Sequence, residues 1–269
     1  MYKLIACDLD ETLLTNDKKI TEENIAAIKA ATEKGVHFVP TTGRGYWSVR
    51  ETLKELGLYE KPNEYIISYN GAAITENADE KILSFDGLSH EIAESLYSKG
   101  LNYDVCTHVY TLDKVYVRNI FDGERKFLNG RMKVEETHEE NLDFIADEKI
   151  PKCIYTNTDH DYLLQIEKDL GDLTDELEVS FSSNRYMEFN KKNVNKGKGL
   201  KRLADLLGVD IKDTIAIGDN FNDLTMIEDA GLGVSVANGV DAVKEKAGYV
   251  TDSDNNHSAV AEVIKKFVL

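Results

Sequence analysis

Short apolar runs alternate with longer segments of helical pattern in the first part of the chain. The runs Leu4 to Cys7, Val36 to Val39 and Tyr65 to Ile67 have the length of strands, and the segments Glu22 to Lys34 and Tyr46 to Leu56 between them read as helices. Near-continuous apolar strands joined by amphipathic helices are typical of a parallel sheet covered on both faces. The pattern therefore predicts an α/β fold with a doubly wound, Rossmann-like parallel sheet.

The same alternation returns near the C-terminal end. The expected elements there are helices at Lys196 to Leu207, Phe221 to Asp229, Val240 to Lys246 and His257 to Phe267, and strands at Thr214 to Ile217 and Gly233 to Val236. Because both ends of the chain show one rhythm, we expect them to build a single core sheet.

Between these parts the pattern is less regular and the helices are more charged. The strands expected here are Tyr103 to Thr107, Lys114 to Arg118, Lys152 to Tyr155 and Glu178 to Phe181. The acidic segment Glu135 to Glu148 contains an apolar face, so we expect a short surface helix or loop instead of a disordered linker. We expect a core domain over residues 1–82 and 188–269 and an inserted α/β cap domain over residues 83–187.

Composition indicates an ordinary globular protein of one or two domains, with 269 residues, of which 42% are hydrophobic and 30% charged. No apolar stretch approaches the roughly 18 to 20 residues of a membrane span, so we expect no membrane association and a cytoplasmic location. The cysteines Cys7, Cys106 and Cys153 are odd in number and form no CxxC. We expect reduced thiols in or near the core.

The formal net charge of −17 argues against a nucleic-acid partner, because such binding needs clustered Lys and Arg that displace counterions. It does not exclude a small phosphorylated metabolite, since a few cations and a metal can gather locally. Most of the charge is explained by a soluble acidic surface.

In open parallel sheets, ligands bind beyond the carboxyl ends of the strands. Asp8 and Asp10 follow the first apolar run at positions i and i+2, where both carboxylates of an extended segment reach one side. This pair alone is also compatible with a turn or a helix cap.

Two further strand-end or helix-start loops carry residues suited to phosphate. Thr42 and Gly43 offer a hydroxyl and an unobstructed backbone N–H at a helix start, although an ordinary helix cap looks the same. Lys196 opens a helix, where it can neutralise a phosphate or a carboxylate cluster, although a lone lysine is more often solvated. No GxxxxGK[ST] loop can be drawn through this stretch.

The richest loop holds Asp219, Asn222 and Asp223 at positions i, i+3 and i+4, on one face of a first helical turn. Two acids and an amide at a helix start suit Mg²⁺ and an anion, and a doubly capped helix is the alternative. The four loops together supply acids, a hydroxyl, a lysine and metal ligands in complementary roles, which chance seldom does.

The order DLDET, TTGR, NKG and GDNFND resembles the four motifs of the haloacid dehalogenase-like phosphohydrolases. A large insert between the second and third motifs, together with Ser68 to Ala72 and the stretch from Ser182 to Asn190, resembles the Cof-type sugar-phosphate phosphatases with an α/β cap. The resemblance covers essentially the whole chain.

The resemblance implies that Asp8 is a nucleophile that attacks phosphorus, and that Asp10 is first a general acid and then a general base. It implies Mg²⁺ held by Asp8, the Asp10 backbone carbonyl and Asp219, with Asp223 supporting the metal site or Lys196. The phosphate contacts that it implies are the Leu9 backbone N–H, Thr42, Gly43, Lys196 and Asn222.

The chain departs from the common family pattern at Glu11, where Gly is usual, and at Pro40 and Thr41, where a small residue often precedes the threonine. Glu11 adds an acid near the nucleophile and restricts a backbone that Gly would leave free. We expect its side chain to point to solvent or to a neighbouring loop.

The family reading implies hydrolysis of small phosphorylated metabolites, with sugar phosphates as the expected class and Arg44 and Asn70 as candidate substrate contacts. Two alternatives stay open: a phosphotransferase or mutase that passes the phosphoryl group to a second sugar, and a noncatalytic binding module. A dinucleotide-dependent oxidoreductase is disfavoured, because no GxGxxG opens a helix after the first strand. We expect a monomer or a weak homodimer.

Overall fold

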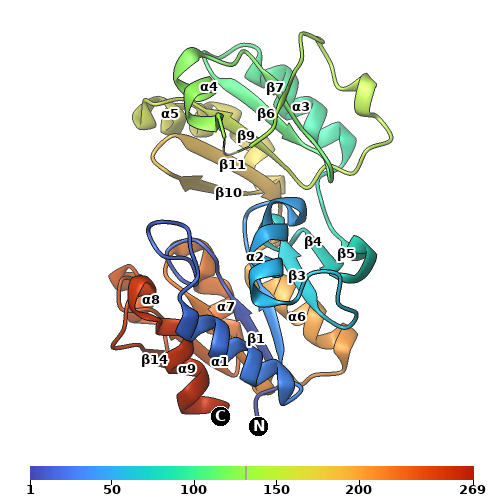
Figure 1. The fold of residues 1–269 in the computed structure, drawn as a ribbon. Coiled ribbons are helices and arrows are strands. Elements are labelled where there is room, and N and C mark those ends of the chain that lie inside the picture. Colours follow the sequence, from blue (N-terminus) through green and yellow to red (C-terminus); the bar gives the residue numbers. More distant parts are fainter. Residues whose placement is uncertain (131) are drawn as a thin grey trace. The chain divides into compact units, whose positions relative to one another are not determined.

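The computed structural model of the chain describes residues 1–130 and 132–269 (Figure 1). It divides into two compact units. The first consists of Met1–Phe85 and Asn195–Leu269, and the second of Asp86–Val194. The boundaries predicted from the sequence lie after residues 82 and 187. Each unit is described below by itself.

The elements of both units lie as follows. The strands are β1 Leu4–Cys7, β2 His37–Pro40, β3 Tyr65–Ser68, β4 Ala73–Glu76, β5 Lys81–Phe85, β6 Cys106–Tyr110, β7 Val115–Arg118, β8 Glu135–Glu136, β9 Lys152–Thr156, β10 Leu177–Ser182, β11 Tyr186–Lys191, β12 Thr214–Gly218, β13 Leu232–Ser235 and β14 Tyr249–Val250. The α-helices are α1 Glu22–Glu33, α2 Arg50–Leu56, α3 His90–Gly100, α4 Asp122–Leu128, α5 His160–Leu170, α6 Lys196–Leu207, α7 Leu224–Asp229, α8 Asp241–Lys244 and α9 Ala259–Phe267.

The first unit is built on a parallel sheet in the order β14-β13-β12-β1-β2. Leu4 of β1 lies opposite Thr214 of β12 on one side and His37 of β2 on the other. The sheet therefore combines strands from the two ends of the chain, and the predicted doubly wound core is confirmed.

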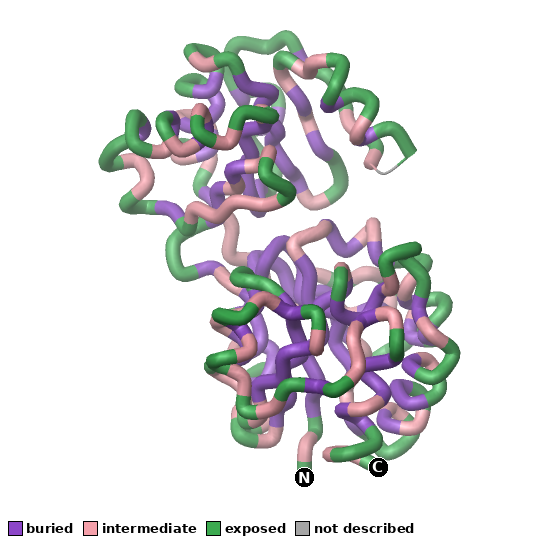
Figure 2. Tube along the Cα trace, turned by 90° about the vertical axis from the view of Figure 1, so that its left-hand side faces the viewer, coloured by how far each residue is buried: buried purple, intermediate pink, exposed green. Residues whose placement is uncertain are grey.

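Helices cover this sheet on both faces. Leu4 and Ala6 of β1 belong to a buried cluster with Leu200 and Leu203 of α6 and Met226 of α7. Since alternate side chains of a strand point to opposite faces, the side chains between them face the other way, where α1 and α9 lie in contact with one another (Figure 1). The sheet is accordingly a buried layer: every residue of β1 and β12 is buried, and Figure 2 shows buried segments running through the interior of this unit.

A second, antiparallel sheet of β3, β4 and β5 belongs to the same unit. The sequence predicts β3 but not β4 and β5, and it places the start of the insert at Leu83, which the structure puts inside β5. A parallel bridge between Thr41 and Ile67 joins β3 to the end of β2. The loop after β2, with Thr42 in it, is therefore fixed against β3, because the Thr42 N–H donates to the Ile67 carbonyl at 2.9 Å.

The second unit is a six-stranded sheet in the order β10-β11-β9-β6-β7-β8, with β7 and β8 parallel and the other pairs antiparallel. One face is apolar and packs on α3 and α5 through a cluster that includes Leu96, Tyr155, Leu163 and Phe189. An α/β insert was predicted, and this sheet with helices on it confirms the class.

Two predictions within the insert differ from the structure. The strand expected at Tyr103 to Thr107 is β6 and begins at Cys106, because Tyr103 closes a turn by donating its N–H to the Gly100 carbonyl at 3.2 Å. Strand β11 was not predicted. The acidic segment is short and irregular as expected, with β8 at one end and a single 3-10 turn at Asp143–Ile145.

Cys7, Cys106 and Cys153 are all free and buried, which agrees with the predicted position of these cysteines in the core. Within residues 1–130 and 132–269, no helix is both long enough and apolar enough to cross a bilayer.

Candidate active site

Asp8 and Lys196 meet at the carboxyl end of the parallel sheet of the first unit. Asp8 directly follows β1, and Lys196 is the first residue of α6. The Lys196 ammonium donates to Asp8 Oδ1 at 2.5 Å and to Asp223 Oδ1 at 2.6 Å. The side chain of Lys196 is fully buried. A buried ammonium needs such partners, because an unpaired charge away from water is costly.

The start of α6 is positioned by its cap. Asn195 has extended backbone geometry, and its side chain accepts a hydrogen bond from the Lys198 N–H at 3.0 Å. An Asn at this position satisfies one of the N–H groups that a helix leaves free at its start. The cap thereby fixes where α6 begins and directs Lys196 toward the carboxylates.

The loop after β12 supplies the other acids. Asp223 Oδ2 accepts the backbone N–H groups of Asp219 at 3.0 Å and Asn220 at 3.1 Å. Gly218 is required by this packing, since a Cβ there would lie 2.5 Å from the Cβ of Asp223. Asp219 in turn accepts a hydrogen bond from the Thr12 hydroxyl at 2.7 Å.

Asp8, Asp219 and Asp223 are buried, and each offers one carboxylate oxygen within 4.8 Å of the others. Oxygens gathered at this spacing suit a hard divalent cation, and Mg²⁺ prefers carboxylate and carbonyl oxygens. The donor set therefore fits the magnesium ion that the sequence predicts.

The electrostatics point the same way. Burial raises the pKa of Asp8 well above its ordinary value, and the nearby Asp223 and Asp219 raise it further, while Lys196 opposes the shift. Burial and Asp223 raise the pKa of Asp219 to about 7. Burial disfavours the charge on Lys196, but Asp223 and Asp8 outweigh it and raise the pKa of the ammonium. Three acids thus share one fixed cation, and a further positive charge would favour their ionised form.

Asp10 has a different environment. Its carboxylate accepts hydrogen bonds from Arg44 and, at 2.9 Å, from the Lys18 ammonium, and 39% of its side chain is exposed. Partial burial opposes ionisation, yet Arg44 and Lys18 together lower the pKa of Asp10 below its ordinary value. The pKa values of Asp8 and Asp10, two residues apart, are therefore shifted in opposite directions.

The predicted phosphate loop follows β2. Thr42 is buried, and its hydroxyl accepts the Arg44 N–H at 3.1 Å. Its carbonyl accepts the Asn70 N–H at 3.0 Å. Asn70 is in the left-handed region with a φ of 55°, and its buried Oδ1 has no hydrogen-bond partner. A Cβ on Gly43 would lie 3.0 Å from that oxygen.

Two other predicted phosphate contacts, Leu9 and Asn222, are located by their backbone and burial. Leu9 is fully buried between the two acids, and its carbonyl accepts the Leu14 N–H at 2.8 Å. Asn222 is exposed on the short turn Phe221–Asp223. Its position beside Asp223 keeps it on the acidic loop.

The sequence interpretation missed Thr12, Lys18 and Asn238. Thr12 stands within the first motif, so its hydroxyl was a readable signal. Lys18 contacts Asp10, and the Asn238 amide donates to the Glu11 carbonyl at 2.7 Å. Both contacts depend on how the loops fold back, which the sequence does not reveal. Glu11 itself has a φ of 60° and is exposed, as expected for a side chain that points to solvent.

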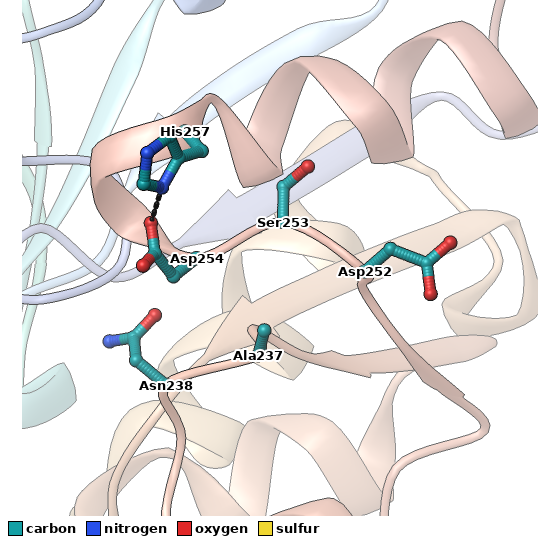
Figure 3. Close-up of a pocket in the computed structure, with 6 residues that line it drawn as sticks. All are labelled: Ala237, Asn238, Asp252, Ser253, Asp254 and His257. Carbon is teal, nitrogen blue, oxygen red and sulfur yellow. Dashed lines mark hydrogen bonds and ion pairs between the residues drawn. The ribbon is translucent and has the colours of Figure 1, made fainter.

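A hollow of about 350 Å³ lies elsewhere in the first unit (Figure 3). Its lining residues are Ala237, Asn238, Asp252, Ser253, Asp254 and His257. His257 Nδ1 lies 2.6 Å from Asp254 Oδ1. No predicted site residue lines it, so the candidate chemistry belongs to the acids and lysine around Asp8 and not to this hollow.

Comparison with known proteins gives one family. The model of the haloacid dehalogenase-like hydrolases matches residues 5–264. The Bacillus subtilis (strain 168) protein YxeH, provisionally named a phosphatase, is 34% identical over 100% of this chain and 99% of its own length. A second protein of that organism, the 5-amino-6-(5-phospho-D-ribitylamino)uracil phosphatase YcsE, is 31% identical over 99% of this chain and 96% of its own length.

A solved structure shows the same fold. The crystal structure of a haloacid dehalogenase-like hydrolase from Bacteroides thetaiotaomicron superposes with a TM-score of 0.86 at 29% identity, over 99% of each chain.

Proposed function

Because the chain belongs to the haloacid dehalogenase-like hydrolases and is a phosphoric monoester hydrolase, we propose that it is a Mg²⁺-dependent phosphatase of small phosphorylated metabolites, working through an aspartyl phosphate on Asp8. The observation that carries the proposal is the buried Asp8–Lys196–Asp223 network with Asp219 beside it. It combines a nucleophile, a fixed cation and oxygens for a metal in one place.

In the first step, a carboxylate oxygen of Asp8 forms a bond to phosphorus while the ester P–O bond breaks. Asp10 donates its proton to the departing alcohol oxygen. In the second step, the Asp10 carboxylate takes a proton from water, and the water oxygen bonds to phosphorus. The bond to Asp8 breaks, which releases inorganic phosphate and restores the free carboxylate.

Lys196 serves the reaction by its position. Its ammonium is held by Asp8 and Asp223, so it stays charged and close to the nucleophile. Both Asp223 oxygens already accept hydrogen bonds. We therefore assign to Asp223 the orientation of Lys196 and of the Asp219 loop.

Mg²⁺ would be held by the carboxylates of Asp8 and Asp219 and by the Asp10 backbone carbonyl. When bound, it supplies positive charge that lets an anionic carboxylate approach an anionic phosphate. The phosphate contacts that we propose are the Leu9 N–H, Thr42, Gly43, Lys196 and Asn222.

Asp10 must carry a proton in the first step, whereas its contacts with Arg44 and Lys18 favour the ionised form. We propose that the ionised carboxylate is well suited to act as the base in the second step, and that the ion pairs are loosened while Asp10 carries the proton needed for the first step. Arg44 is then available to the substrate beside Asn70, whose Oδ1 has no hydrogen-bond partner.

For the substrate we propose a sugar or polyol phosphate. The similarity to YcsE, which is named for a ribitylamino phosphate, supports this class. We further propose that the second unit acts as a cap that selects the substrate, and that the enzyme works in the reducing cytoplasm, in keeping with its free thiols.

The test is phosphate release from a panel of sugar phosphates, polyol phosphates, nucleotides and flavin phosphate, with Mg²⁺ or with EDTA. We expect Mg²⁺-dependent release, fastest for sugar or polyol phosphates. Adding an excess of a free sugar distinguishes a phosphotransferase, which would form a new sugar phosphate in place of inorganic phosphate. Release that persists in EDTA would contradict the metal assignment.

A further inference from the structure

The turn that follows β13 contacts both loops of the candidate metal site. The side-chain amide of Asn238 donates to the Glu11 carbonyl at 2.7 Å, in the loop after β1. The Val240 N–H donates to the Asp219 carbonyl at 2.9 Å, in the loop after β12. Asn238 and Val240 are two residues apart, so one short turn joins the two loops that carry the acids.

A third contact joins the two loops to each other. The buried Thr12 hydroxyl donates to Asp219 Oδ1 at 2.7 Å, and Thr12 directly follows Glu11 in the chain. The hydrogen bonds therefore form a closed path, from Asn238 through the Glu11–Thr12 peptide to Asp219 and back through Val240. Because the path closes, the position of each loop depends on the other.

Glu11 has a conformation that needs support. Its φ of 60° lies in the left-handed region, which is costly for a residue with a Cβ. A residue stays in such a conformation only where its surroundings hold it, and the bond from Asn238 holds its carbonyl. The Asp10 carbonyl lies on one side of Glu11 and Thr12 on the other. A change of φ at Glu11 would therefore turn the Asp10 carbonyl relative to Thr12.

Asn238 is itself oriented by a neighbour. It lines the hollow of Figure 3, and its Oδ1 accepts the Asn255 N–H at 3.0 Å. This bond leaves the amide nitrogen of Asn238 directed to Glu11. Asn255 is buried, and its own side-chain amide donates to the Leu14 carbonyl at 3.0 Å. The loop after β1 is thereby held at a second point by the same part of the chain.

We propose that Asn238 is a positioning residue of the metal site. It holds Glu11 in its left-handed conformation. The Asp10 carbonyl and the Thr12 hydroxyl, on either side of Glu11, are thereby kept in the directions that the metal site needs. The inference rests on the proposed function, since Mg²⁺ is part of that proposal. Asn238 acts through Glu11 and is not itself assigned to the metal or to the phosphate.

The first test is the affinity for Mg²⁺, measured by isothermal titration calorimetry on the full chain without substrate. Asn238→Ala removes the donor at an exposed position, so it leaves no buried cavity. Loss of one hydrogen bond predicts that the Kd for Mg²⁺ rises about two- to tenfold. His257→Ala is the matched control, since His257 lines the same hollow and pairs with Asp254, and it should keep the Kd of the wild type. An unchanged Kd in Asn238→Ala would overturn the proposal.

A double-mutant cycle tests whether Asn238 acts through the backbone of Glu11. Gly adopts positive φ without strain, so in Glu11→Gly protein the loop should keep its shape with less help from Asn238. The rise in Kd caused by Asn238→Ala should therefore be smaller in Glu11→Gly protein than in the wild type. An equal rise in both backgrounds would show that Asn238 does not act through Glu11, and the assignment would be wrong.

Hydrogen exchange in EDTA separates this inference from the proposed function. The N–H groups of Leu13 and Leu14 donate to carbonyls of the same loop, and they should exchange faster in Asn238→Ala than in the wild type or the control. If the wild type binds no Mg²⁺ while this exchange depends on Asn238, the metal assignment of the proposed function fails and the positioning of the loop stands. If the exchange is the same in Asn238→Ala and the wild type, the inference fails whatever the result with Mg²⁺.

Discussion

At the scale of single residues, two aspartates two positions apart have opposite surroundings. Asp8 is buried among acids with one lysine, and its pKa is raised chiefly by burial. Asp10 is partly exposed, and Arg44 and Lys18 lower its pKa against the effect of burial. Environments that separate the pKa values of two neighbouring acids are common where one acid transfers a proton and the other is the nucleophile.

The Asp10 contacts predict a pH effect. Lys18→Met removes one of the two cations that favour ionised Asp10, so the pKa of Asp10 should rise. The limb of the pH–kcat profile that requires protonated Asp10 then moves to higher pH. Lys19→Met is the matched control, since the neighbouring lysine has an exposed side chain. A profile that stays the same in Lys18→Met would remove Asp10 as the proton donor.

Glu11 predicts a change in stability. Its φ of 60° is costly for a residue with a Cβ and free for glycine. Glu11→Gly should therefore raise the free energy of unfolding by up to about 1 kcal/mol, measured by urea denaturation. Lys29→Gly, at an exposed position in the interior of α1, should lower it by about 1 kcal/mol. A loss of stability in Glu11→Gly would show that the glutamate makes a contact worth more than the strain.

The positions of the charged residues could be predicted wherever they follow an apolar run. Asp8, Lys196 and Asp219 stand at strand ends or helix starts, and the rule that parallel strands deliver such residues to one edge brings them together. The partners of Asp10 could not be predicted. Lys18 returns to it only because the loop between β1 and α1 folds back, and that path depends on tertiary contacts.

At the scale of elements, α6 shows which boundaries a sequence can reveal. The predicted range Lys196 to Leu207 is confirmed, because Asn195 caps its start and Gly208, with a φ of 64°, ends it. Both are strong local signals. Strand β11 was missed although Met187 and Phe189, which face the apolar cluster, alternate with polar residues as in a half-buried strand.

The cap of α6 can be tested directly. Asn195→Ala removes the acceptor of the Lys198 N–H and should lower the free energy of unfolding by about 1 kcal/mol. Asn195→Ser keeps an acceptor and should lose much less. Because Lys196 is the next residue, kcat should fall in Asn195→Ala and recover in Asn195→Ser. Equal stability of the two variants would contradict the capping role.

At the scale of the whole molecule, the second unit is inserted in the sequence of the first. Residues from both ends of the chain build the first unit. The changes of texture near residues 83 and 187 indicated this insertion. In the structure, the boundaries between the units lie after Phe85 and Val194. The predicted boundaries differ because β5 and β11 were not recognised in the sequence. Strand boundaries that no turn or cap residue marks could not be predicted from the sequence.

Global stability should depend on His108 in the second unit. Burial and the nearby Lys152 lower the pKa of His108 to about 3, although Glu188 opposes the shift. The unfolded value is about 6.5, so the folded state binds fewer protons, and stability rises with pH. The contribution is complete above about pH 6.5 and is lost as pH falls toward 3. His108→Gln should flatten this part of the curve of unfolding free energy against pH, and an unchanged curve would contradict this assignment.

The most direct test of the account is phosphate release by Asp8→Asn. The substitution removes the nucleophilic carboxylate and keeps the size of the side chain. Asp205→Asn, at an exposed position in α6, is the matched control, and circular dichroism confirms that both variants are folded. We expect Mg²⁺-dependent release by the wild type and by Asp205→Asn, and a loss of at least a thousandfold in Asp8→Asn, in keeping with removal of a covalent nucleophile. Release by folded Asp8→Asn at the rate of the wild type would contradict the central claim that Asp8 accepts the phosphoryl group.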